Sequence, residues 1–287
     1  MSNQITTNYV QQFKETLYHL VQQKGSRLRE HVTVEMVTGE HAYFDQIGAT
    51  QAIERTARHS DSPLVNTPHA RRRVPMRDFE WGDLIDDQDK VRALIDPTSS
   101  YLRNAMWALG RKMDDLVIEA AFADAATGKT GGTLIAFPAG QQIAAAASGL
   151  TIDKLLQAKQ KLDAAEVDAD DPRVIVCSAR QIKDLLGTTQ ITSADYNSVK
   201  ALAQGEIDTF LGFRFIRSER LPQDGSSNRR VIAFARSGIG LAIGKDMKAS
   251  VAERPDKAFA TYVYACLSAG ASRLEEERVV EIKCTEA

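Results

Sequence analysis

The sequence predicts an α+β protein, in which one long helix is combined with strands drawn from distant parts of the chain and a second α/β portion is inserted near residues 135–236. Three observations predict this class. Residues 99–126 carry apolar side chains at helical spacing and contain no proline or turn cluster. The inserted portion holds three helical segments and a short apolar β-branched run. The last fifty residues mostly alternate, as strands do.

The long helix is expected to begin with Asp96 as its N-cap and Pro97 at its first position, and to end at Thr127-Gly128. Residues 99–126 would span about 42 Å, with Gly110 as the one internal weak point. One face is apolar, through Leu102, Ala105, Met106, Leu109, Met113, Leu116, Val117 and Ala120.

The opposite face of this helix carries a second apolar group, made of Trp107, Ile118 and Phe122. Two interpretations stay open. The helix is either sandwiched inside its own domain, or one face packs on the home core while the other meets a second element or subunit.

The composition fits a soluble globular protein with one large or two ordinary domains, since 287 residues include 43% hydrophobic and 26% charged residues. A net charge of −2 gives no general attraction to nucleic acid or to an anionic membrane. No apolar run reaches the length of about 18 residues that a membrane span needs. The N-terminus lacks the features of a secretory signal. Three widely spaced cysteines fit reduced thiols in the cytosol.

Residues 1–44 are expected to form an extended arm. Residues 5–24 have the pattern of an amphipathic helix, and residues 31–44 alternate loosely on either side of a turn at Thr38-Gly39, which predicts a short hairpin. A helix followed by a short hairpin, ahead of any compact core, is typical of an arm.

Residues 45–75 have few apolar residues and are punctuated by three prolines, which predicts a segment without a core of its own. So long a segment is uncommon inside a compact domain. It is therefore either disordered or an extended β-hairpin held by something outside its own domain. A basic block, Arg71–Arg73 with Arg77, precedes an acidic block at residues 78–89. Such blocks suit head-to-tail pairing between identical copies. The alternative is a solvated charged loop.

The remaining elements are predicted in order along the chain. Helices are expected over 151–165, where Thr151 can act as the cap, and over 180–186, where Gly187 ends the helix; a third, short helix is expected over 196–203. Strands are predicted at 173–178, 210–218, 231–235, 239–243, 248–253, 259–268 and 275–284.

Glycine motifs do not establish a nucleotide site. Gly128-Lys129-Thr130 resembles part of a phosphate-binding loop, but Ala123 occupies the position of its first glycine, and the segment follows a helix rather than a strand. Gly238, Gly240 and Gly244 are one residue out of the dinucleotide fingerprint. A flexible loop and a tight strand connection explain these two segments better.

No catalytic, cofactor-binding or metal-binding residue is predicted. All five histidines precede residue 70 and none has a ligand spacing. Cys177 ends a predicted strand, where an inert core thiol is favoured over a nucleophile. Asp114 and Asp115 are adjacent, so on a helix they point about 100° apart and form no acid–base pair.

Several stretches resemble the major capsid proteins of tailed bacteriophages with the Hong Kong 97-type fold. They are QITTNYVQQF, TPHARRRVPMRDFEWGDLID, DKVRALIDPTSSYLRNAMWALGRKMDDLVIEAAF, PAGQQI and SRLEEERVVEI, and together they extend over nearly the whole chain. The resemblance implies an N-terminal arm at 1–44, an extended loop at 45–97 that lies on a neighbouring subunit, and a peripheral domain with its spine helix at 98–134. It also implies an axial domain at 135–236, with strands at 237–287 returning to the peripheral domain.

The resemblance further implies a non-enzymatic protein without cofactors that self-assembles into an icosahedral head shell around double-stranded DNA. Its copies would form pentamers and hexamers, with a portal protein and a possible decoration protein as partners, and without a membrane. The arm begins almost at Met1, so a separate scaffold protein is expected. Assembly would take place in the host cytoplasm and the product would be the virion. No covalent cross-link between loops is predicted.

The expected assembly interface joins the basic and acidic blocks and the second helix face: Arg71, Arg72, Arg73, Arg77, Asp78, Glu80, Asp86, Asp87, Trp107, Ile118 and Phe122. Two other functions stay open. The same fold builds encapsulin compartments that carry enzyme cargo, and the α/β portion could belong to a nucleotide-binding enzyme that uses Gly128-Lys129-Thr130.

Overall fold

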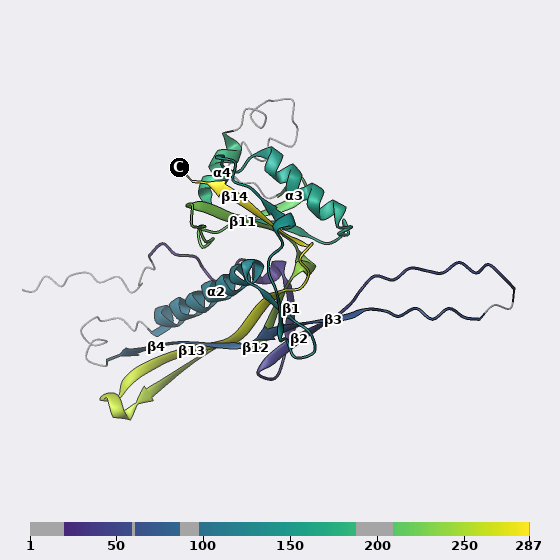
Figure 1. Cartoon of the computed structure of the whole chain (residues 1–287). Helices are drawn as coiled ribbons and strands as arrows, with labels where there is room; N and C mark the ends of the chain where they lie inside the picture. The colour runs from purple at the N-terminus through teal and green to yellow at the C-terminus, as the bar shows by residue number, and fades with distance from the viewer. Residues whose placement is uncertain (1–19, 59–60, 87–97, 188–208, 287) are drawn as a thin grey trace, which may run out of the picture. The chain divides into compact units, whose positions relative to one another are not determined.

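The computed structural model describes residues 20–58, 61–86, 98–187 and 209–286 (Figure 1). Two compact units are formed, and the boundary between them crosses both the long helix and the longest pair of strands. The first contains residues 20–26, 78–86, 98–112 and 245–267, and the second contains the remaining described residues. The elements bear out a mixed α+β fold.

In chain order the strands and helices are β1 (Thr33–Met36), β2 (His41–Ile47), β3 (His69–Pro75), β4 (Arg77–Ile85), α2 (Thr98–Phe122), β5 (Ala125–Thr127), β6 (Thr133–Ile135), β7 (Gln142–Ile143), α3 (Ile152–Ala164), β8 (Arg173–Cys177), α4 (Ala179–Leu186), β9 (Thr209–Phe210), β10 (Phe213–Arg217), β11 (Asn228–Ala235), β12 (Ile239–Arg254), β13 (Ala260–Arg273) and β14 (Val279–Thr285). Short 3₁₀ turns lie at Arg29–His31, Ala139–Gln141, Arg236–Gly238 and Pro255–Lys257.

Helix α2 forms where the apolar spacing predicts it. Leu109, Met113, Leu116 and Val117 on the predicted face are all buried. The helix ends at Phe122 rather than at Ala126, because Ala125–Thr127 pair with β3 and β6 as strand β5. At 25 residues it is about 37 Å long. The predicted cap, Asp96, lies outside the described residues.

The buried guanidinium of Arg273 closes the end of α2. Its Nη1 donates to the carbonyl oxygens of Ala121 and Ala123, at 3.1 and 2.9 Å, and its Nη2 donates to that of Ile135, at 3.1 Å. A positive charge is favourable at a helix C-terminus, where carbonyl groups lack partners within the helix. Arg273 therefore joins the ends of β13, α2 and β6.

The α/β portion is built on a six-stranded sheet with the order β7-β14-β11-β8-β10-β9. Strand β8 pairs in parallel with β10 and antiparallel with β11, and residues Val174–Cys177 are fully buried, as their apolar run predicts. Helices α3 and α4 lie beside this sheet (Figure 1). The predicted caps form: the Thr151 hydroxyl accepts from the amide of Lys154, and Gly187 ends α4.

Strand β14 corrects the predicted domain boundaries. It pairs antiparallel with β11 and in parallel with β7. The last strand thus completes the sheet of the α/β portion, although residues 237–287 were all expected to return to the other domain. Its alternation identified a strand, but carried no information about the partner strand.

Two further strand predictions need correction. The segments 239–243 and 248–253 form one continuous strand, β12, of 16 residues, in a four-stranded sheet with the order β1-β12-β13-β4. The hairpin predicted over 31–44 does not form. Strand β1 pairs in parallel with β12, whereas β2 pairs antiparallel with β3. Pairing with distant strands replaces the local turn.

Two predicted helices fall on residues that the structure does not describe. Residues 196–203 lie wholly outside the described ranges, and residues 5–24 do so except for residues 20–24, which are not helical. In the described part of the chain, no helix combines the length and apolar character needed to cross a lipid bilayer.

Lys154 holds α3, its preceding loop and β14 together. The side chain is buried, and its ammonium donates to four backbone carbonyls: Ala145 at 2.8 Å, Ser148 and Gly149 at 2.9 Å, and Lys283 at 3.0 Å. Burial lowers the pKa of this ammonium. The four oxygens offset that cost, because hydrogen bonds from charged donors are stronger than neutral ones.

We expect Lys154→Met to lower the free energy of unfolding by about 3 kcal/mol, because methionine fills the space but leaves the buried carbonyls without a donor. Chemical denaturation measures the change. Lys183→Met, at an exposed position on α4, is the matched control and should change the free energy by less than about 0.5 kcal/mol. Equal effects at the two positions would contradict the role assigned to the carbonyl cluster.

Candidate functional site

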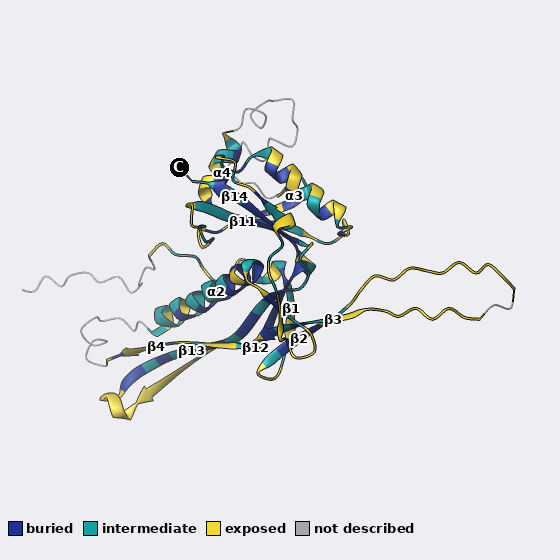
Figure 2. Ribbon diagram, viewed as in Figure 1, coloured by how far each residue is buried: buried dark blue, intermediate teal, exposed yellow. Residues whose placement is uncertain are grey.

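An extended hairpin, formed by β2 and β3, is the most prominent feature of the second unit. The two strands pair from His41 opposite Pro75 to Ile47 opposite His69, and a long loop joins them. Every described residue of that loop, at 48–58 and 61–68, is exposed, as the yellow ribbon of Figure 2 shows. Exposed apolar side chains occur at Ile47 (71%), Ile53 (60%) and Leu64 (89%). The structure therefore has the extended hairpin that was one of the two alternatives for this segment.

The root of the hairpin is packed onto the β12–β13 strands. Phe44, Val74 and Ala42 are buried with Ala242 of β12. Two glycines permit the close approach. A Cβ on Gly240 would lie 2.9 Å from the Phe44 ring, and one on Gly270 would lie 2.3 Å from the carbonyl oxygen of Pro75. The hairpin thus has a fixed base and an uncovered loop.

The three successive arginines of β3 point to alternate faces, because strand side chains have a period of two. Arg72 is 5% exposed. Its Nη2 donates to both carboxylate oxygens of Glu276, at 2.7 and 2.8 Å, and its Nε donates to the carbonyl of Leu274, at 2.8 Å. The Gln46 amide donates to the same carbonyl at 2.8 Å. Arg72 is thus part of the interior and connects the hairpin to the segment after β13.

Arg71 lies on the exposed face, where its Nε donates to Asp45 at 2.5 Å and its guanidinium stands 5.1 Å from the centroid of the Tyr43 ring. The hydrogen bond from Arg71 lowers the pKa of the Asp45 carboxyl. Exposed pairs of this kind contribute little to stability, about 0–1 kcal/mol.

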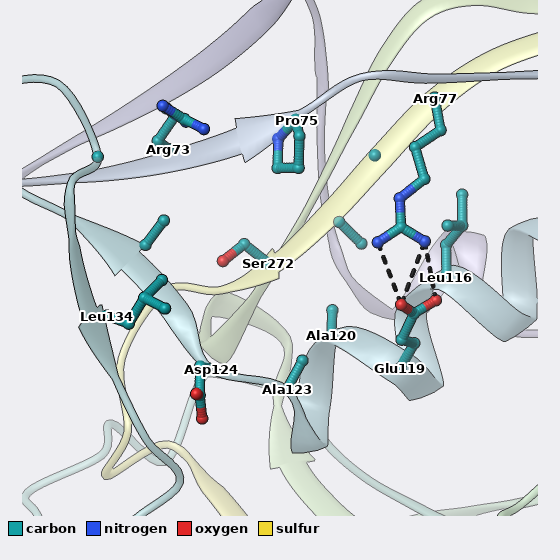
Figure 3. Close-up of a pocket in the computed structure, with 14 residues that line it drawn as sticks. Arg73, Pro75, Arg77, Leu116, Glu119, Ala120, Ala123, Asp124, Leu134 and Ser272 are labelled. Atoms are coloured by element: carbon teal, nitrogen blue, oxygen red, sulfur yellow. Dashed lines mark hydrogen bonds and ion pairs between the residues drawn. The ribbon is translucent and has the colours of Figure 1, made fainter.

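Arg73 and Arg77 border a pocket of about 250 Å³ beside the hairpin root (Figure 3). Arg77 pairs with Glu119 of α2 at 3.1 Å, and Arg73 Nη1 donates to the carbonyl of Thr130 at 2.9 Å. Alanines, Leu116 and Leu134 supply an apolar lining, while Asp124 and Ser272 add polar groups. Neither histidine nor cysteine lines the pocket, and its chemistry suits a polypeptide contact better than catalysis.

The structure gives each of the four predicted interface arginines a partner in its own chain. The expectation that they form an open basic patch needs revision for Arg72, which is buried. On the acidic side, Asp78, Glu80 and Asp86 are exposed, and the Glu80 carboxylate accepts a hydrogen bond from Tyr264 at 2.8 Å. Asp87 lies outside the described residues.

The second apolar face of α2 is partly covered by the chain itself. Ile118 is 4% exposed, so we exclude it from any surface offered to another copy. Phe122 is half-buried, with the guanidinium of Arg230 3.9 Å from its ring centroid. Trp107 is half-buried, with the Lys24 ammonium 5.8 Å from its ring centroid. For Ile118 and Phe122, the packing agrees with a helix enclosed by its own domain.

The N-terminal segment crosses α2 at Gly110. A Cβ on this glycine would lie 2.6–2.7 Å from backbone atoms of Gly25 and Ser26. Arg111 Nη1 donates to Gln22 Oε1 at 2.9 Å and to the carbonyl of Gln23 at 3.0 Å. The glycine that weakens the helix in the sequence therefore provides room for the arm.

The buried carboxylate of Asp114 also holds this segment. It accepts from the amides of Arg27 and Leu28 at 3.0–3.1 Å. Sequence reasoning missed this role, and that of Glu276. The signal available was that Asp114 lies at helical spacing from Gly110, Val117 and Ile118, none of which has a polar side chain.

The motifs that the sequence analysis set aside have structural explanations. Gly128-Lys129-Thr130 forms the turn between β5 and β6, where the amide of Gly131 donates to the carbonyl of Gly128 at 3.1 Å. Burial raises the pKa of the Cys177 thiol to about 12, as fits an inert core cysteine. Among the described residues, no three His, Cys, Asp or Glu side chains come together in a way that could hold a metal ion.

A family model and several solved structures match this chain over nearly its whole length. Residues 5–286 match the family described as phage capsid protein. The capsid of cyanophage P-SCSP1u has a TM-score of 0.76 at 17% identity, covering 99% of this chain and 95% of that one. A Mycobacterium phage Che8 structure has a TM-score of 0.72 at 17% identity, covering 96% and 97%. The capsid of Ralstonia phage GP4 has a TM-score of 0.76 at 11% identity, covering 98% and 96%. No curated protein sequence matches. At sequence identities of 11–17%, the structural similarity shows a shared fold and no more.

Arg72→Met should lower the free energy of unfolding by about 3 kcal/mol, because the half-buried Glu276 carboxylate loses its two strongest hydrogen bonds. Arg71→Met, on the opposite face of the same strand, is the matched control and should cost at most about 1 kcal/mol. Denaturant titration of the two variants measures the difference. A loss at Arg71 as large as that at Arg72 would contradict the assignment of Arg72 to the interior.

Gly110→Ala tests the crossing of the arm. Helix propensity alone predicts a gain of about 1 kcal/mol, but the added methyl group collides with the arm backbone. We therefore expect trypsin to cleave after Lys24 and Arg27 faster in this variant, followed by mass spectrometry. Gly140→Ala is the control, because a Cβ there has nothing within 4 Å. Unchanged cleavage in Gly110→Ala would show that the arm does not depend on this crossing.

Proposed function

Because this chain belongs to the phage capsid protein family, we propose that its copies assemble into the closed icosahedral head shell of a tailed phage with a double-stranded DNA genome. The chain is a structural protein with the Hong Kong 97-like fold of the capsids that it resembles. The family match favours a phage shell over a cargo compartment of the same fold. The proposed function is association between copies of the chain, and we assign no chemical reaction to the protein.

The observation that supports assembly most directly is the loop of the β2–β3 hairpin. Ile53, Leu64 and Val65 are 60%, 89% and 41% exposed, and every described residue around them is exposed as well. Large apolar side chains on this loop are not buried by their own chain, so they lack the stabilisation that burial would give. Exposed apolar side chains on a long loop are typical of an interaction surface. We assign the loop to a neighbouring subunit.

We place the other contacts between copies at the exposed members of the predicted interface. Asp78, Glu80 and Asp86 lie on the surface, and 41% of the Arg71 side chain remains accessible beside Asp45. Arg72 and Ile118 support the shell indirectly, by holding the hairpin root and α2 in place.

The finer features of the particle follow as proposals from the family. One fold would serve in both pentamers and hexamers, with a portal protein, a separate scaffold protein and a possible decoration protein as partners. The product is the virion capsid, assembled in the host cytoplasm. Contact with the packaged double-stranded DNA would be non-specific and weak, because a net charge of −2 gives the chain no general attraction to phosphate groups.

Replacing residues 49–67 with a short Gly-Ser turn tests this function. The wild-type protein should form shells, tubes or capsomers in negative-stain microscopy. The shortened chain should remain folded, because the paired strands and the buried root are kept, but should sediment as single subunits.

Exchanging Thr56 and Thr67 for alanine is the matched control, since both are exposed loop residues without large apolar side chains. This variant should assemble as the wild type does. Closed shells from the shortened chain would contradict the role given to the loop, and a wild-type protein that stays monomeric with every partner supplied would contradict the shell function itself.

A further inference from the structure

We propose that Lys129 and Ile47 beside the hairpin root of one copy receive the acidic outer face of β4 from a second copy. The inference rests on the proposed shell assembly and names the two surfaces that meet. It arises from a difference in pairing: the arginines of the basic block have partners in their own chain, whereas Lys129, Asp78 and Asp86 have no ion pair with any residue that the structure describes.

The receiving surface is an open concavity of about 800 Å³ between the end of the hairpin strands and the β5–β6 turn. Ile47 and His69 line it from the strands, and Lys129 lines it from the turn. Arg71 also lines it, but Asp45 takes up its charge. Lys129 is exposed, and within the described ranges it has no ion pair. The concavity thus combines an uncompensated cation with an aliphatic side chain that is 71% exposed.

Local geometry holds Lys129 at this place. Gly128 and Gly131 have positive φ angles of 90° and 71°, and the hydrogen bond between them closes a four-residue turn with Lys129 at its corner. Arg73 fixes the turn by donating to the carbonyl of Thr130, and the Thr127 hydroxyl donates to the carbonyl of Arg71 at 2.9 Å. The lysine is therefore presented by a turn that is tied to the hairpin root.

The complementary surface is the outer face of β4, an edge strand of its sheet. Alternation puts Asp78, Glu80, Leu84 and Asp86 on one face, and all four are exposed. Tyr262 covers the intervening Gly82, where a Cβ would lie 2.2 Å from the tyrosine oxygen. This face therefore offers carboxylates on either side of a leucine that is 40% exposed.

The two surfaces match in kind. One has an exposed aliphatic side chain next to an exposed cation, and the other has an exposed aliphatic side chain next to exposed carboxylates. Asp78 and Asp86 have no ion pair with any residue that the structure describes. Each copy carries one surface of each kind, so the contact is heterologous and can be repeated around a closed shell. A carboxylate of β4 would pair with Lys129 while Leu84 covers Ile47.

Charge exchange tests the pairing. Lys129→Glu alone, and Asp78→Lys with Asp86→Lys alone, should each lower the association constant about tenfold or more at about 50 mM salt, where screening is weak. The chain carrying all three substitutions should regain association. Sedimentation velocity and negative-stain microscopy give the assembled fraction, and circular dichroism confirms that each variant is folded. Lys183→Glu, at an exposed site on α4, is the control and should assemble normally.

Mixing the two defective variants distinguishes a contact between copies from a contact within one chain. Each variant supplies the charge that the other needs, so an equimolar mixture should associate although neither does alone. Normal assembly of Lys129→Glu, or failure of both the triple variant and the mixture, would overturn the pairing while leaving the shell function intact. A wild-type chain that forms no assembly at all would instead overturn the proposed function, and this inference with it.

Discussion

The hairpin root depends on a small buried group of charges at the end of β13. Arg273 donates to carbonyl groups at the C-terminus of α2 and to one in β6. Arg72 of β3 donates to the carbonyl of Leu274 and to the carboxylate of Glu276, both within the three residues that follow Arg273 in the sequence. The guanidinium of Arg273 also lies 3.7 Å from Glu276. The end of β13 and the residues that follow it are thereby joined to β3, to the C-terminus of α2 and to β6. Removing one partner from such a group costs more than an exposed ion pair contributes, because the remaining charge stays buried.

Local patterns carried much of the fold prediction. The spacing from Leu109 to Val117 identified α2, Thr151 and Gly187 marked helix ends, and the apolar run before Cys177 identified a buried strand. Strand partners were harder to predict, because pairing depends on segments brought together from far along the chain. Nothing near Val34 indicates that β1 lies beside Leu241, and nothing near Ile282 indicates that β14 lies beside β11 and β7.

In the candidate site, too, local features could be predicted from the sequence and contacts between distant segments could not. A run of three arginines is normally solvated, so the sequence alone favoured a uniform basic surface. Strand alternation and the nearby Glu276 make Arg72 an interior residue and leave Arg71 outside. Gly110 appeared only as a weak point of the helix, because the arm that crosses it comes from a segment more than eighty residues earlier. Exposure along the loop could be predicted, since prolines and sparse apolar residues exclude a core there.

The position of β14 has a consequence for biosynthesis. This strand lies between β7 and β11, so the six-stranded sheet is incomplete until residue 285 has been synthesised. A pairing between segments about 140 residues apart is also slow to form, since a long loop must close first. A chain interrupted before residue 279 lacks an interior strand and leaves β11 with an open edge. Truncated products therefore lack a finished α/β portion, because their six-stranded sheet is divided at the place of β14.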